Sequence, residues 1–146
     1  MGNFFSRVSW LGVILGAIVN EVATNVFALP LLVYLIISHH FVGMASENAP
    51  QILDSLRADI GLYAAFLILG SAASVLGGWV AGWIADHDVL LNATLSSFLC
   101  EIIAIWSHSA ETSTLVFVLI LIANPLLTLL GGYLYLWQKG RMSEAW

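Results

Sequence analysis

A glutamate interrupts the first long apolar segment of the chain, and its chemistry needs an explanation. Asn20 precedes Glu21, and Thr24 and Asn25 follow it at the three- and four-residue spacing that places side chains on one helix face. Charged groups within a bilayer are rare and costly, so they mark functional sites by default. Because hydrocarbon does not solvate a carboxylate, we expect Glu21 to favour its protonated form. Such a group suits proton-coupled transport or the binding of a cationic solute.

Two later apolar segments also carry polar residues. Glu101 lies in a polar stripe with Thr94, Ser97 and His108. Asn124 precedes Pro125, which is expected to break the last apolar helix and to free a backbone carbonyl one turn back. The sequence therefore predicts an intramembrane polar site centred on Glu21 and containing Asn20, Thr24, Asn25, Glu101 and Asn124. The alternative is that these groups only form interhelical hydrogen bonds, worth about 0.6 kcal/mol each on average.

Three histidines are expected at one membrane interface, near Glu47 and Glu111. Imidazole and carboxylate groups bind zinc or copper. However, His39 and His40 are adjacent rather than at helical ligand spacing, and His108 lies in a different loop. We therefore favour solvated histidines and expect no metal site.

No sequence pattern of an enzyme is present. The chain has no H-E-x-x-H, no G-x-S-x-G and no phosphate-binding glycine loop followed by a lysine. Cys100 is the only cysteine, which excludes an intrachain disulfide and a cysteine-based metal cluster. We therefore expect neither enzymatic activity nor a cofactor.

The elements that would position these residues are membrane helices. The 146-residue chain is 60% apolar and 9% charged, whereas soluble domains carry about 25% charged residues. Four segments of 8–37, 60–85, 89–107 and 114–137 have the length and character of membrane spans. The sequence thus predicts an all-α membrane protein, a single domain built as an antiparallel bundle of four transmembrane helices. Residues 49–58 are predicted either as an amphipathic helix on the outer surface or as an extension of the second span.

Small residues repeat along the first two segments and predict close helix packing. Membrane helices associate through such residues because lipid supplies no hydrophobic force between them. The predicted packing face consists of Gly12 and Gly16 in the first segment and Gly70, Ser74, Gly77, Gly78 and Gly82 in the second. It would serve either packing within the chain or contact with another protein or a second copy.

Basic residues predict the orientation. Arg7, Lys139 and Arg141 would lie on the side of the two termini, and only Arg57 on the other. The excess of basic residues on the cytoplasmic side of membrane proteins then places both termini in the cytoplasm, with the protein in the cell (inner or plasma) membrane.

Two functions from different classes fit these features. The first, which we favour from the sequence, is an accessory or scaffolding subunit that packs against a larger membrane complex or against itself. The second is a small oligomeric proton- or cation-coupled transporter with Glu21 as its titratable group. Both require the lipid bilayer and partners within it, whether other subunits or further copies. Nucleic acid is not expected, because four Lys and Arg residues are too few to neutralise phosphates.

Overall fold

The computed structural model describes residues 4–38, 49–107 and 114–144. Of these residues 95% are helical and none lies in a strand. The helices are η1 (Phe4–Arg7), a 3-10 helix, and the α-helices α1 (Trp10–Ser38), α2 (Ala49–Ala58), α3 (Ile60–Ala85), α4 (Val89–Ser107) and α5 (Thr114–Glu144). Within this part of the chain, three segments are long and apolar enough to cross a membrane: Trp10–Ser38, Ile60–Ala85 and Phe117–Gly140. α4 contains a shorter apolar stretch, Val89–Ile103.

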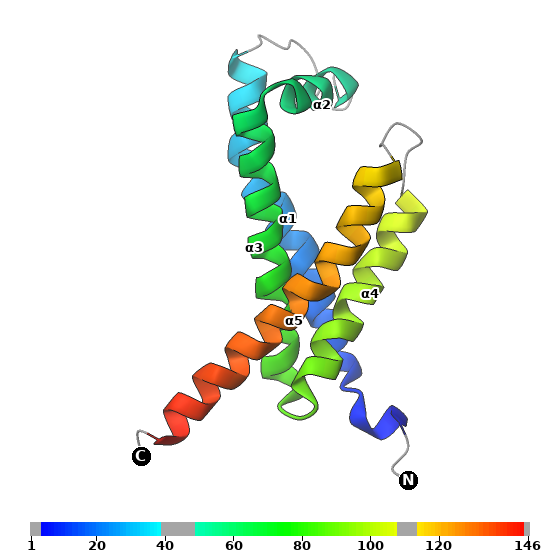
Figure 1. The fold of residues 1–146 in the computed structure, drawn as a ribbon, viewed down its shortest axis with the longest axis vertical. Coiled ribbons are helices and arrows are strands. Elements are labelled where there is room, and N and C mark those ends of the chain that lie inside the picture. The colour runs from blue at the N-terminus through cyan, green and yellow to red at the C-terminus, as the bar shows by residue number, and fades with distance from the viewer. Residues whose placement is uncertain (1–3, 39–48, 108–113, 145–146) are drawn as a thin grey trace.

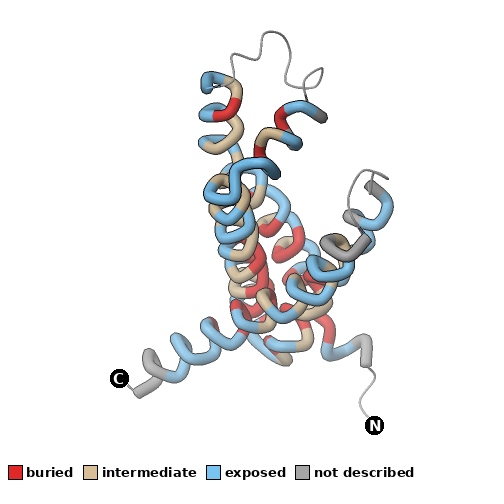
Figure 2. The backbone as a smooth tube through the Cα atoms, turned by 45° about the horizontal axis from the view of Figure 1, so that its top comes forward, coloured by how far each residue is buried: buried red, intermediate tan, exposed pale blue. Residues whose placement is uncertain are grey.

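α3 is the central helix of the structure and contacts each of the other α-helices. α1 lies beside α3, while α4 pairs with α5, and the two pairs diverge toward the end at which α2 lies (Figure 1). The two termini and the turn between α3 and α4 lie at the opposite end. The buried residues concentrate where the helices cross, whereas residues 136–140 of α5 are exposed (Figure 2).

Glycines allow α1 and α3 to pack closely. A Cβ atom added to Gly16 would lie 2.6 Å from the Cβ of Ala81 and 2.9 Å from the carbonyl oxygen of Gly77. A Cβ added to Gly77 would lie 2.8 Å from the carbonyl oxygen of Gly16, and one added to Gly12 would lie 2.9 Å from that of Ala81. Because no side chain fits at these distances, the three glycines are required for this approach.

The crossing of α3 and α5 is closer still. A Cβ on Gly78 would lie 2.0 Å from the carbonyl oxygen of Thr128, and one on Gly131 would lie 2.0 Å from that of Val75. The space beside Gly82 is also filled, since an added Cβ would lie 2.6 Å from Cγ1 of Val89. By contrast, a Cβ on Gly70 would meet nothing within 4 Å. Most of the predicted packing face is therefore occupied within the chain, and Gly70 is the exception.

α5 is one continuous helix, so the expectation that Pro125 breaks it is wrong. The helix continues through Pro125 to Glu144, beyond the expected end at Trp137. A proline removes only one backbone donor, and the Thr128 hydroxyl donates to the carbonyl oxygens of Asn124 and Pro125 at 3.1 and 3.0 Å in this turn. α1 likewise continues through Pro30.

α2 is separate from α3 rather than an extension of it. The Asp59 carboxylate lies between them and accepts hydrogen bonds from the backbone N–H groups of Gly61 and Leu62, which caps α3. Ile52 and Leu56 of α2 pack against Leu35 of α1, which is 1% exposed. The apolar face of α2 therefore covers the ends of α1 and α3.

The turn between α3 and α4 is held by its two aspartates. Asp86 and Asp88 have φ angles of 55° and 43°, the left-handed region that Asp adopts more readily than most residues. Asp88 forms an ion pair with Arg7, and Asp86 forms one with Lys139 and accepts a hydrogen bond from the Tyr135 hydroxyl at 3.0 Å. The turn is thus bonded to both ends of the described chain.

Asn92 anchors the same turn from inside α4. It is 0% exposed. Its Oδ1 accepts from the backbone N–H of Ser9 at 2.7 Å, and its Nδ2 donates to the carbonyl oxygens of Arg7, His87 and Asp88. One side chain therefore joins the start of α1 to the start of α4.

Replacing Gly78 by alanine is expected to destabilise the protein. The added methyl group would overlap the carbonyl oxygen of Thr128, and overpacking of this kind costs about 1–3 kcal/mol. Gly70→Ala is the matched control in the same helix, because its methyl group meets nothing within 4 Å. Thermal unfolding in mild detergent should show a lower midpoint for Gly78→Ala alone. Equal midpoints for the two variants would contradict the observed crossing of α3 and α5.

Acid is expected to weaken the α3–α4 turn. Hydrogen bonding from Arg7 lowers the pKa of Asp88, and hydrogen bonds from Lys139 and then Tyr135 lower that of Asp86. A carboxyl with a lowered folded-state pKa stabilises the fold above its unfolded pKa, about 3.9. That contribution is lost as the pH falls through the folded value.

Unfolding of the wild type and Asp88→Asn at a series of pH values tests this expectation. Their stabilities should differ at pH 7 and converge only as the pH falls from about 4 through the lower folded-state pKa of Asp88. A difference that persists unchanged at low pH would count against the role of the ionised carboxylate.

Candidate functional site

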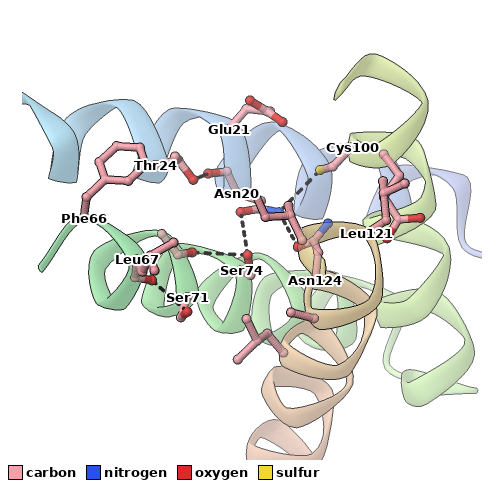
Figure 3. A pocket seen from close by; sticks show the side chains of 15 residues that line it. Asn20, Glu21, Thr24, Phe66, Leu67, Ser71, Ser74, Cys100, Leu121 and Asn124 are labelled. Carbon is pink, nitrogen blue, oxygen red and sulfur yellow. Dashed lines mark hydrogen bonds between the residues drawn. The ribbon is translucent and has the colours of Figure 1, made fainter. Parts of the chain in front are cut away.

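The Asn20 side chain lies where the four long helices meet. It is 6% exposed. Its Nδ2 atom donates to Cys100 Sγ on α4 and to Asn124 Oδ1 on α5, both at 3.4 Å, and its Oδ1 atom accepts from Ser74 Oγ on α3 at 3.4 Å (Figure 3). One amide on α1 is therefore bonded to the three other long helices. We call these four residues the Asn20 hub.

An amide suits this position because it has two N–H donors and a carbonyl acceptor that can serve different neighbours. The two bonds to oxygen in the hub are longer than the usual 2.7–3.0 Å or so, and the thiol sulfur is a weak acceptor, so each bond is individually weak. Two further bonds support the hub: the Cys100 thiol contacts the carbonyl oxygen of Ala17 at 3.7 Å, and the Thr24 hydroxyl donates to that of Asn20 at 2.8 Å. The hub thus depends on several weak bonds acting together in an apolar environment.

Asn20 occupies the centre at which the sequence placed Glu21. Glu21 is exposed, and its side chain points away from Asn20 and from α3 (Figure 3). Asn25 is also exposed, and its Nδ2 donates to the backbone carbonyl of Glu21 at 2.7 Å rather than to the carboxyl group. Consecutive helix residues point about 100° apart, so Asn20 and Glu21 cannot both face the same point.

A pocket of about 270 Å³ lies beside the Asn20 hub. It is bounded by α1, α3, α4 and α5, on the side of the hub where the helix pairs diverge toward α2. Its polar lining consists of Asn20, Glu21, Thr24, Ser71, Ser74, Cys100, Glu101 and Asn124, and its apolar walls include Phe66, Leu67, Ile120, Leu121 and Leu127. The structure therefore brings five of the six predicted polar residues to one pocket, and Asn25 is the one outside it.

Glu101 is the partly buried carboxyl of this pocket. Its Oε1 atom is buried and has no hydrogen-bond partner among the residues that the structure describes. A buried acceptor without a partner is destabilising by about 1–3 kcal/mol. The Glu101 carboxyl is therefore a polar group of the pocket with a buried oxygen whose bonding is incomplete.

His39, His40 and His108 lie outside the described residues. Within residues 4–38, 49–107 and 114–144, no group of three His, Cys, Asp or Glu side chains is arranged to hold a metal ion.

The inward face of α4 was not predicted from the sequence. Asn92, Ser96 and Cys100 are buried at four-residue spacing. This spacing in the sequence indicates that the three residues share one helix face. In the polar stripe predicted along this helix, Ser97 is also buried. The Thr94 hydroxyl donates to the carbonyl oxygen of Leu90 within the same helix. α4 therefore turns small polar residues toward the other helices.

Asn20→Leu is expected to destabilise the protein by roughly 2 kcal/mol or less. It keeps approximately the same volume but removes the three interhelical bonds, which average about 0.6 kcal/mol each in membranes. Asn25→Leu is the matched control, since Asn25 is exposed and bonds within α1. Unfolding in mild detergent should separate the two variants, and similar losses would contradict a hub at Asn20.

Comparison of the chain with models of protein families, with curated proteins and with solved structures gives no match.

Proposed function

We propose that the protein is a small membrane carrier that binds a small cationic solute in the pocket beside the Asn20 hub. The observation that carries this proposal is the presence of two carboxyl groups, Glu21 and Glu101, on different helices at one pocket within apolar helices. Intramembrane carboxyls of this kind accompany ion and proton pathways. Each would attract a cation far more strongly here than in water, because the surroundings have a low dielectric constant.

Proton coupling follows from the same carboxyls. A carboxyl that binds a cation must release its proton, and protonation in turn displaces the cation. We therefore assign exchange of a cation for a proton to this site, with Glu21 at the exposed edge of the pocket as the group that exchanges protons. The volume of about 270 Å³ lies just below the range of ligand pockets, about 300–1,000 Å³. This favours a small solute over a lipid or a peptide.

The proposal includes a bundle of four membrane spans, with α4 as the fourth. α4 has 19 residues, so it is about 28 Å long at 1.5 Å per residue, close to the hydrocarbon thickness of about 30 Å. Its buried polar residues face the other helices, which supports a place inside a membrane bundle.

We propose that both termini are cytoplasmic and that the protein lies in the cell membrane. The end that holds the termini and the α3–α4 turn (Figure 1) also carries Arg7 and Lys139, while Arg57 of α2 lies at the other end. Basic residues gather on the cytoplasmic side.

An accessory or scaffolding subunit is the second candidate. The glycine face supports it less than expected, because most of its members are filled within the chain. The observation that favours it is the outer face of α5, where Tyr133 and Trp137 are 58% and 51% exposed. A helix surface of this kind suits another membrane subunit or a second copy.

Proton movement in reconstituted vesicles tests the carrier proposal. Vesicles with a pH dye inside receive a gradient of Na⁺, K⁺ or acetamidinium, a small organic cation. The wild type should exchange protons for at least one of these cations, so that protons move in the direction opposite to the cation. Glu21→Gln, which keeps the shape but cannot exchange a proton, should lose at least about nine-tenths of this flux, consistent with the loss of a required acid–base group.

Asn25→Leu is the control, because it lies on the same helix outside the pocket. Its flux should equal that of the wild type. A wild type that behaves like protein-free vesicles, or an unchanged flux for Glu21→Gln, would overturn the carrier proposal. Co-purification of a stoichiometric membrane partner, with no flux, would favour the accessory role.

A further inference from the structure

We propose that the pocket selects small organic cations with N–H donors, such as protonated amines or amidines, and that Glu101 is the residue that holds them. This inference rests on the proposed function and names the class of its substrate. A pocket with carboxyl groups can attract three kinds of cation: metal ions, quaternary ammonium ions and cations with N–H groups.

The bonding of Glu101 favours a hydrogen-bond donor. Its Oε1 atom is buried at the pocket and lacks a hydrogen-bond partner among the described residues. A ligand N–H group would complete this acceptor with a charge-assisted bond, which is about twice as strong as a neutral one. A quaternary ammonium ion has no N–H group and would leave the oxygen without a partner.

The other polar groups of the pocket disfavour a metal ion. Hard cations such as Ca²⁺ take six to eight oxygen ligands or so. In the described part of the chain, no three His, Cys, Asp or Glu side chains form a metal-binding group. Asn20, Ser74 and Asn124 are already bonded to each other in the hub. An ion without its water shell would therefore find too few ligands.

The walls favour a ligand with an apolar portion. Phe66 and Leu67 of α3 face the pocket together with Ile120 and Leu121 of α5. These side chains suit an alkyl group, while the two carboxyls repel an anion. The site thus has a charged, hydrogen-bonding side and an apolar side, as an alkylated ammonium or amidinium ion requires.

Gly70 provides a way to fill the pocket without disturbing the bundle. It lines the pocket, and a Cβ atom there meets nothing within 4 Å. Gly140 in α5 has the same open surroundings for a Cβ atom but does not line the pocket. Gly70→Leu and Gly140→Leu therefore form a matched pair, in which only the first introduces bulk at the site.

Calorimetric titration of the purified full chain in mild detergent tests the inference. The probes are acetamidinium, tetramethylammonium, which is of similar size but has no N–H group, and acetamide, which has the acetamidinium shape without the charge. Acetamidinium should bind the wild type at least about tenfold more tightly than either of the others, the equivalent of one charge-assisted hydrogen bond. Glu101→Gln should weaken it at least about tenfold, Gly70→Leu should abolish binding, and Gly140→Leu should leave it unchanged.

Equal affinities for acetamidinium and tetramethylammonium in the wild type would overturn the selection of N–H donors, whatever the variants do. The carrier proposal would survive that result if the proton flux remained sensitive to Glu21→Gln. Unchanged acetamidinium binding in both Gly70→Leu and Glu101→Gln would place the ligand elsewhere and overturn the assignment. The absence of cation-driven flux in vesicles would instead reject the proposed function itself.

Discussion

The structure depends on the Asn20 amide, which must satisfy its hydrogen-bonding groups inside an apolar bundle. In apolar surroundings, a polar group that lacks a hydrogen-bond partner is costly. The amide takes its partners from Ser74, Cys100 and Asn124, one on each of the other long helices. Its bonding therefore specifies how α1 is rotated and how far each neighbour can move away. The three bonds are weak individually, but all of them are formed by the same amide group.

The close packing of α1 and α3 makes this arrangement possible. A Cβ on Gly77 would come within 2.8 Å of the Cβ of Asn20, so the glycine contact and the hub belong to one feature. On the other side of α3, Gly78 admits the backbone of α5 at Thr128. Toward α2 the two helix pairs separate (Figure 1), and the pocket lies between the tight crossing and this opening. Packing thus positions two carboxyls beside the pocket.

The bounds of α3 and α4 could be predicted from the sequence, but the direction in which each side chain points could not. Apolar length and the positions of charged residues define where a membrane helix begins and ends, as for α3 and α4. By contrast, Asn20 and Glu21 are both polar and adjacent, and only the positions of the neighbouring helices decide which faces inward. Gly77 and Gly78 show the same limit, since one contacts α1 and the other α5. The amphipathic pattern of α2 also fits either a membrane surface or, as found here, the protein around Leu35.

The most direct test of this account is a double-mutant cycle between Asn20 and Asn124. The free energy of unfolding would be measured for the wild type, Asn20→Leu, Asn124→Leu and the double variant in one detergent or bilayer. A bond between the two amides predicts a coupling energy of about 0.6 kcal/mol, with an upper value near 1.7 kcal/mol. Additive effects, with a coupling energy below about 0.3 kcal/mol, would show that Asn20 does not hold α5, and would contradict the hub on which the pocket depends.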